Sequence, residues 1–137
     1  MENKILLEIV TPERLLIKEN VDEVTAPGIE GEFGVLPGHT AFLTTLKIGE
    51  ISYKKGSEAK YIAVSWGYAE VGPSKVTILA ETAEIAEEID IKRAEEERAR
   101  ALAALSKKDA EEKDFKLKEA SIEKAVVRMQ VAGRISR

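Results

Sequence analysis

The residue composition changes abruptly in the middle eighties, and this change constrains the fold more than any other feature. All four prolines, eight of the nine glycines and six of the seven aromatic residues lie at or before Pro73. Such residues are typical of turns and strands, whereas the rest of the chain consists mainly of strong helix formers. The sequence therefore predicts two parts, a β domain over residues 1–86 and a helical part over residues 87–137.

Short alternating segments predict the strands of the first part. In YIAVSWGYAEV (61–71), the residues Ile62, Val64, Trp66 and Tyr68 are expected to share one face of a strand. The residues between them are mostly small or apolar, which suits a strand covered on both sides. Similar segments stand at 5–10, 23–26 and 75–79, and a turn is expected at 55–57. Many short strands separated by turns favour an antiparallel β-sandwich.

The second part predicts a helical hairpin. Asp90 is placed as an N-cap, the following residues carry a thin, alanine-rich apolar stripe, and SKKD (106–109) interrupts the pattern. Gly133 is a natural end for a second helix. So short a connector predicts two antiparallel helices. Alanine stripes bury little apolar area, so we expect a weakly held hairpin whose arrangement a ligand or partner could select.

Composition excludes several classes of protein. A net charge of −4 disfavours nonspecific nucleic-acid binding, which needs a basic face. The chain has no cysteine, which excludes disulfides and thiolate metal sites. The apolar run near the N-terminus is broken by Glu8 and Glu13, unlike a secretory signal, and no stretch approaches the roughly 20 apolar residues of a membrane span. We therefore expect any membrane association to come through partners.

The segment PGIEGEFGVLPGHT (27–40) has the glycines of a phosphate loop and the chain's only histidine. Its spacing matches neither the dinucleotide fingerprint nor the Walker loop, and no helix start follows it. His39 has no second histidine and no nucleophile motif to complete a catalytic site. We expect turns rather than a catalytic centre; a hydrolase built on His39 would lose its activity in His39→Ala.

A second segment, EEIDIKRAEEERAR (87–100), leaves two interpretations open. Arg93 and Arg100 could meet anionic oxygens beside the capped start of the helix, with Asp90 and nearby amides free to bind a purine. The alternative is a solvated helix face with an ordinary cap and ion pairs along its surface. Spacing alone favours the second interpretation.

Four segments together resemble the epsilon subunit of bacterial F-type ATP synthases, over the whole chain. They are VTPERLL, PGIEGEFGVLPGHTAFLTTLKIGEI, VSWGYAEV and IDIKRAEEERARA. The resemblance implies a noncatalytic central-stalk subunit, with its β-sandwich against the gamma subunit and the c-subunit ring. The hairpin would either fold back or extend towards the alpha and beta subunits, where it inhibits ATP hydrolysis.

The resemblance also implies contacts and a location. Glu30 and Glu32 would face the c ring, and His39 would lie on the side that meets gamma. The complex would carry out proton-driven ATP synthesis, so the chain would be peripheral at the cytoplasmic face of the bacterial plasma membrane. It would require no cofactor.

Some members of that family bind ATP in the folded hairpin through a motif that Ile89, Asp90, Arg93 and Ala94 match. Three further positions match supporting residues of those members, namely Glu84, Arg100 and Arg128. Two of the family's arginines are replaced, by Leu117 and Lys124. We therefore expect ATP as a regulatory ligand, bound more weakly than in those members.

The basic C-terminal end carries a further implied contact. Lys124, Arg128 and Arg134 would meet an acidic segment of the beta subunit, an attraction that salt should weaken. An alternative that the residues leave open is a freestanding ATP-sensing module that works without a large complex. Co-purification with gamma and the catalytic subunits would separate the two hypotheses.

Overall fold

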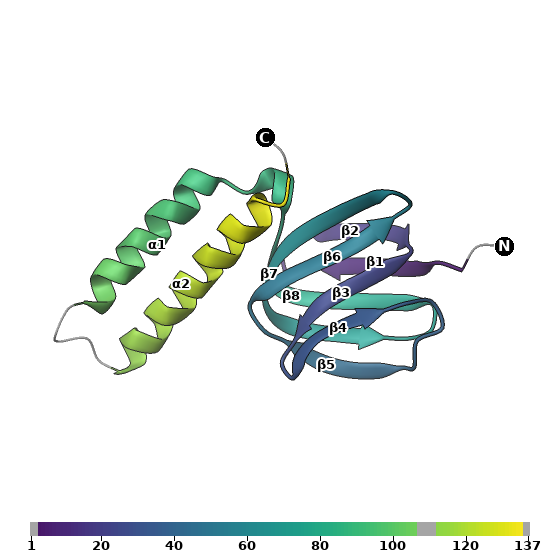
Figure 1. The fold of residues 1–137 in the computed structure, drawn as a ribbon. Coiled ribbons are helices and arrows are strands. Elements are labelled where there is room, and N and C mark those ends of the chain that lie inside the picture. The colour runs from purple at the N-terminus through teal and green to yellow at the C-terminus, as the bar shows by residue number, and fades with distance from the viewer. Residues whose placement is uncertain (1–2, 107–111, 136–137) are drawn as a thin grey trace. The chain divides into compact units, whose positions relative to one another are not determined.

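The computed structural model describes residues 3–106 and 112–135. The chain divides into two compact units, Met1–Ile85 and Ala86–Arg137 (Figure 1). No helix within the described ranges is long and apolar enough to cross a membrane.

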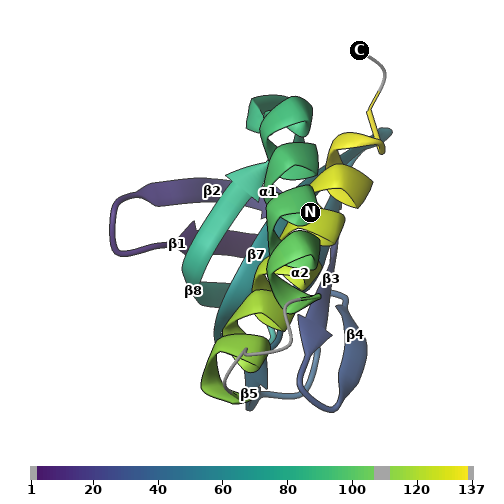
Figure 2. The ribbon, with the colours of Figure 1, turned by 90° about the vertical axis from the view of Figure 1, so that its left-hand side faces the viewer.

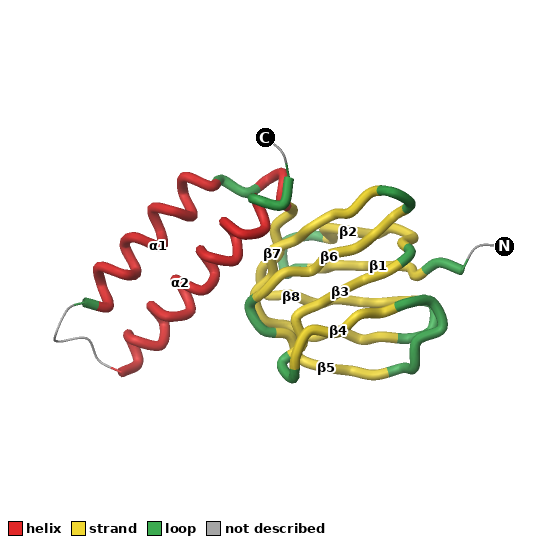
Figure 3. The backbone as a smooth tube through the Cα atoms, viewed as in Figure 1, coloured by secondary structure: helices red, strands yellow, loops and turns green. Residues whose placement is uncertain are grey.

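The first unit is built from eight strands that fold over into two layers (Figure 3). Their bounds are β1 (Ile5–Val10), β2 (Leu15–Val21), β3 (Glu23–Gly28), β4 (Gly31–Val35), β5 (Phe42–Leu46), β6 (Gly49–Lys55), β7 (Glu58–Val71) and β8 (Lys75–Ile85). The strand order is β2-β1-β8-β7-β5-β3-β4, and β6 pairs with both β3 and β7. The pair β1 and β8 runs parallel and the other pairs run antiparallel. The predicted β-sandwich is confirmed.

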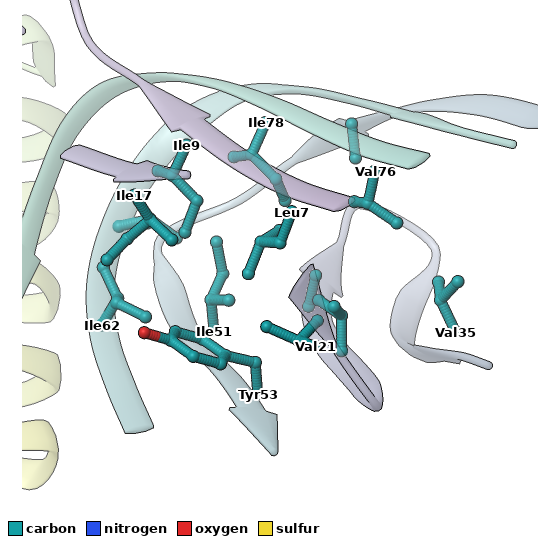
Figure 4. Packing of buried hydrophobic residues seen from close by; sticks show 14 of the residues in the cluster. Leu7, Ile9, Ile17, Val21, Val35, Ile51, Tyr53, Ile62, Val76 and Ile78 are labelled. Atoms are coloured by element: carbon teal, nitrogen blue, oxygen red, sulfur yellow. The ribbon is translucent and has the colours of Figure 1, made fainter. Parts of the chain in front are cut away.

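The core of the sandwich lies between its layers and follows from the alternation along each strand. In β1, Ile5, Leu7 and Ile9 are fully buried while the residues between them are only partly buried. Branched side chains from the other strands meet them, as Figure 4 shows for Ile51 and Ile78. Burying each such side chain contributes roughly 1.5–3 kcal/mol, so the interior is built from the most effective residues available.

Strand β7 belongs to both layers, because it changes partner halfway along. Its first half pairs with β6, where Val64 lies opposite Gly49, and its second half pairs with β5, where Gly67 lies opposite Leu46. The change occurs at Trp66, whose φ of 41° is the only positive value at a non-glycine residue within the described ranges. Gly67 follows with a φ of 150°, so two consecutive residues leave the ordinary extended conformation.

This change corrects the expected face of β7. Ile62 and Val64 lie in the core as predicted, but the side chains of Trp66 and Tyr68 are 39% and 55% exposed. The core positions after the change are Ala69 and Val71 instead. The physical reason is the backbone geometry at Trp66, which shifts the alternation by one residue, so that the side chains expected inside point outward.

A polar cluster lies beside the two-residue turn between β6 and β7. Tyr53 Oη donates a hydrogen bond of 2.6 Å to Glu19 Oε2, and Lys55 Nζ lies 3.4 Å from Glu19 Oε1. The hydrogen bond from Tyr53 holds the pKa of the Glu19 carboxyl below its usual value. Gly56 occupies the predicted turn with a φ of 62°, and its N–H donates 2.7 Å to Asp22 Oδ2. The end of β6 is thus joined to β2 through Glu19, and the turn itself is joined to Asp22, which follows β2.

The second unit is a short 3₁₀ helix, η1 (Ala86–Glu88), followed by two α-helices, α1 (Ile91–Leu105) and α2 (Glu112–Ala132). The helices run antiparallel, side by side (Figures 1 and 2). Asp90 caps α1, since its Oδ1 accepts 3.1 Å from the Arg93 N–H. Gly133 ends α2, and its N–H donates 3.0 Å to the Met129 carbonyl. The connector expected at 106–109 lies outside the described residues beyond Ser106.

The buried side chains of the second unit are mostly alanines, with Ile89 and Val131 as the larger exceptions. Ala94, Ala101, Ala125 and Ala132 are at most 5% exposed, whereas Leu102, Phe115, Leu117 and Val126 are each more than 40% exposed. Alanine removes one methyl group from water, so each of these positions contributes far less than a core isoleucine. The expected stripe is alanine-rich, but its buried positions on α1 are Ala94 and Ala101, whereas Arg98 and Leu102, which the spacing placed on it, are exposed. The helices depend correspondingly more on caps and charge pairs.

Candidate functional site

An apolar groove of about 860 Å³ lies on the surface of the sandwich, beside the change of partner in β7. Large apolar side chains from separate segments line it: Val10, Pro12, Ile29, Trp66, Tyr68 and Leu79. Ile29 is 59% exposed and Leu79 is 51% exposed. A contiguous apolar surface of this kind marks a site for a partner rather than for water.

Local backbone geometry creates the groove. The positive φ at Trp66 turns an indole outward that the strand alternation would bury, and Tyr68 follows on the same face. Gly67 permits this because a Cβ there would lie 1.9 Å from the Leu79 carbonyl oxygen. Residue type alone did not indicate this groove, and none of its residues was among the predicted site residues.

A second hollow, of about 470 Å³, lies beside the turn between β3 and β4, and Glu30, Glu32 and Leu43 help to line it. Both carboxylates are exposed, and Leu43 is 70% exposed. Phe33 and Phe42 pack edge to face there, with ring centroids 5.1 Å apart. The two glutamates predicted to meet the c ring therefore share one end of the sandwich with an exposed leucine.

His39 lies in the loop between β4 and β5, where it is partly buried. Its Nδ1 lies 2.7 Å from the Thr40 carbonyl oxygen, and its ring centroid lies 5.3 Å from that of Phe42. These contacts suit a packed loop residue. Among the residues that the structure describes, no three acidic, histidine or cysteine side chains are grouped to hold a metal ion.

A charged cluster joins the two helices of the second unit. Glu97 accepts a hydrogen bond of 3.2 Å from Arg93 Nε on its own helix and one of 3.1 Å from Arg128 Nη1 on α2. The Arg128 side chain is only 18% exposed, compared with 70% for Arg93. Two of the predicted nucleotide-binding arginines are thus brought together, on one carboxylate.

The remaining predicted nucleotide-binding residues have different surroundings. Ile89 and Ala94 are buried, and Asp90 is the helix cap described above. Arg100 lines a hollow of about 260 Å³ between the helices, together with Glu97, Ala101, Lys118 and Ser121. Glu84 belongs to the first unit, where it lies in β8 opposite Ala63 of β7.

Two further predicted residues lie at the C-terminal end of the second unit. Lys124 is half-buried on α2, and Arg134 follows the helix as an exposed residue whose N–H donates 3.0 Å to the Val131 carbonyl. The replacement residue Leu117 is 58% exposed. Sequence reasoning missed Glu97 and Lys118; the spacing of four between Arg93 and Glu97 was the available signal for the first.

Comparison with known families and proteins gives one consistent result. Residues 4–86 match the family described as ATP synthase, Delta/Epsilon chain, beta-sandwich domain, and residues 87–133 match its long alpha-helix domain. The ATP synthase epsilon chain of Geobacter sulfurreducens is 52% identical over 137 residues, which is 100% of this chain and 99% of the relative. That of Geobacter metallireducens is 53% identical over the same shares.

Solved structures agree with these relatives. A chain of the Euglena gracilis mitochondrial ATP synthase, in a structure of its OSCP, F1 and c-ring, superposes with a TM-score of 0.82 at 25% identity. The match covers 98% of this chain and 84% of that chain. A chain from the central stalk and c-ring of the Tetrahymena thermophila enzyme has a TM-score of 0.64 at 13% identity, covering 94% and 96%, and shares the fold.

Proposed function

Because the chain belongs to the ATP synthase delta/epsilon family, as a noncatalytic epsilon subunit of the central stalk, we propose that its two units divide that subunit's work. The sandwich couples the gamma subunit to the c ring during proton-driven ATP synthesis. The hairpin inhibits ATP hydrolysis by the alpha and beta subunits and senses ATP.

The apolar groove is the observation that carries the proposed contact with gamma. It combines an outward-turned indole, a phenol and exposed aliphatic side chains over a hollow of about 860 Å³. A stable protein interface has an apolar centre with aromatic anchors, and Trp66 and Tyr68 would supply them here. The occupant that we assign to the groove is therefore an apolar segment of gamma.

Two leucines of equal exposure allow a matched test of this contact. Leu79 lines the groove and Leu15 does not, and both are 51% exposed. We expect Leu79→Ser to weaken binding to purified gamma by at least tenfold, because it places a hydroxyl at the centre of an apolar contact. Leu15→Ser should leave binding unchanged. Equal binding by both variants would contradict the assignment and favour another occupant, such as the chain's own helices.

The second contact, with the c ring, is assigned to the hollow beside the β3–β4 turn. Glu30 and Glu32 are exposed there next to Leu43, which gives a small apolar patch flanked by negative charge. His39, packed against Phe42 in the next loop, would hold the neighbouring surface in shape and meet gamma. Replacing both glutamates with glutamine should weaken association with c-ring membranes more at low salt than at high salt.

The hairpin is suited to a change of arrangement because its buried contacts are mainly alanine. Little apolar area holds α1 and α2 in place, so ligands or partners that contribute a few kcal/mol can select one arrangement. ATP would bind through Asp90, Arg93, Arg100 and Arg128, and the basic end with Lys124 and Arg134 would meet beta. The chain would lie at the cytoplasmic face of the bacterial plasma membrane, held there by the complex.

Two experiments test the hairpin's roles. Calorimetric titration of ATP into the full chain should show saturable binding that is lost in Arg93→Ala and weakened in Asp90→Ala. The full chain should slow ATP hydrolysis by the F1 complex, and deletion of residues 87–137 should remove that inhibition while leaving gamma binding intact. No binding at millimolar ATP would contradict the sensing role and leave the inhibitory role to be judged by the hydrolysis assay.

A further inference from the structure

Glu97 occupies an unusual position for a helix surface residue, since each of its carboxylate oxygens binds a different guanidinium. Oε1 accepts from Arg93 Nε at 3.2 Å, and Oε2 accepts from Arg128 Nη1 at 3.1 Å. Arg93 lies four residues before Glu97 on α1, whereas Arg128 comes from α2, 31 residues further along the chain. One side chain therefore connects two cations on two helices.

Glu97 also lines the hollow between the helices. Arg100 and Lys118, one from each helix, line that hollow together with Glu97. Two cationic side chains thus contact Glu97 directly, and two more line the same hollow. An anion entering the hollow would meet Arg100 and Lys118, next to the carboxylate that already holds Arg93 and Arg128.

Partial burial gives this arrangement consequences for binding. The side chains of Arg128 and Glu97 are 18% and 35% exposed, so their attraction is less screened by water than that of a fully exposed pair. A phosphate group binds guanidinium through the same charge-assisted hydrogen bonds as a carboxylate does. A nucleotide phosphate bound at Arg93 and Arg128, as in the proposed function, would compete with Glu97 for both guanidinium groups.

We propose that Glu97 is an internal substitute for the nucleotide phosphate, which latches α1 to α2 when no nucleotide is bound and which ATP must displace. The competition rests on the proposed ATP binding, whereas the latch does not. On this view, the hairpin is held closed in two ways, by Glu97 without ATP and by the phosphates with it. Because Glu97 already stabilises the closed hairpin, binding of ATP adds less stability than it would in a protein with a neutral residue at position 97.

Glu97→Gln tests both parts, because glutamine keeps the shape of the side chain and removes its charge. Glu96→Gln is the matched control, since Glu96 is an exposed glutamate of the same helix. In calorimetric titrations of ATP into the full-length protein, we expect Glu97→Gln to bind about five- to tenfold more tightly than the parent, and Glu96→Gln to bind as the parent does. Equal or weaker binding by Glu97→Gln would overturn the competition.

Hydrogen exchange of the nucleotide-free proteins tests the latch independently. Amides of α1 and α2 should exchange several-fold faster in Glu97→Gln than in the parent or in Glu96→Gln, while those of the sandwich should not change. Unchanged exchange in the helices would overturn the latch whatever ATP does. Faster exchange with no ATP binding in any of the proteins would support the latch, overturn the competition and contradict the sensing role.

Discussion

The two units of this chain are stabilised by different means. Among the described residues, the largest fully buried side chains belong to the sandwich, with the single exception of Ile89. The two helices bury mainly alanines, together with Val131, and rely on a capping aspartate, a glycine end and the pairing of Glu97 with two arginines. Apolar area fixes one structure, whereas caps and charge pairs of about 1 kcal/mol each leave alternatives within reach.

This difference in stabilisation indicates which unit can be regulated. Local opening requires little free energy where few apolar side chains are buried, and it approaches the cost of global unfolding in a branched aliphatic core. The sandwich is therefore suited to permanent contacts and the hairpin to conditional ones. The following substitutions would break or sharpen this comparison.

The largest effect is expected in the sandwich core. Ile78→Ala removes a fully buried side chain and leaves a cavity, so we expect the free energy of unfolding to fall by about 2–5 kcal/mol. Urea denaturation followed by tryptophan fluorescence would measure it. Leu43→Ala, at a side chain that is 70% exposed, should change stability by about 0.5 kcal/mol or less. Similar decreases in the free energy of unfolding at both positions would contradict the view that burial of apolar area holds the sandwich together.

A smaller but still large effect on stability is expected at Gly67, where β7 changes its partner strand. Gly67→Ala places a Cβ 1.9 Å from the Leu79 carbonyl oxygen at a φ of 150°, so the backbone must move, at a cost of about 1–3 kcal/mol. Gly34→Ala, where a Cβ would meet nothing within 4 Å, is the control. Movement at Gly67 should also weaken gamma binding, because the groove beside Trp66 changes shape. If Gly67→Ala is less stable but still binds gamma as the parent does, then the shape of the groove does not depend on the backbone geometry at Gly67.

A local effect is expected at the start of the hairpin. Asp90→Ala removes the side chain that accepts the Arg93 N–H, so α1 should lose about 1 kcal/mol of local stability. Hydrogen exchange should show faster exchange of the first α1 amides and unchanged exchange in the sandwich. Asp90→Ser, which retains a capping oxygen, should restore most of the protection. Slower folding of the whole chain would instead indicate that the units depend on each other.

The smallest effect is a pH dependence in the sandwich. The pKa of Glu19 is lowered by the hydrogen bond from Tyr53, so the ionised carboxylate stabilises the folded state above its unfolded pKa of about 4.3. That contribution is lost as the pH falls through the lower folded pKa. Glu19→Gln should therefore be less stable than the parent by a few tenths of a kcal/mol at pH 7 and equal to it in acid. Thermal melts across pH 3–7, with Glu13→Gln as control, would measure the difference.

Much of the fold follows from local sequence signals. The β-sandwich, the helical hairpin, the Asp90 cap and the glycine turn at Gly56 depend on composition, alternation and capping within a few residues, and the structure contains each of them. The predicted face of Trp66 and Tyr68 was wrong. Their exposure depends on the change in backbone conformation where β7 stops pairing with β6 and begins to pair with β5. The alternation of residues within one strand cannot predict such a change.

The candidate sites show the same division. The pairing of Arg93 with Glu97 could be anticipated from their spacing, but the contact of Glu97 with Arg128 requires knowledge of how α1 meets α2. The groove gathers side chains from β1, β7, β8 and the β3–β4 turn, so its existence depends on tertiary structure. The predicted contacts of Glu30, Glu32, His39, Lys124 and Arg134 stay predictions until the partner subunits are tested.

The shared strand β7 has a mechanical consequence for a subunit of the central stalk. Its backbone runs without a break from the β6 side of the sandwich to the β5 side, past the groove at Trp66. A sideways load applied at the groove is then carried into both layers through covalent bonds, and not only through side-chain packing between them. We expect the two layers to resist sliding under that load, so that the sandwich would respond to the proposed contact with gamma as a stiff block.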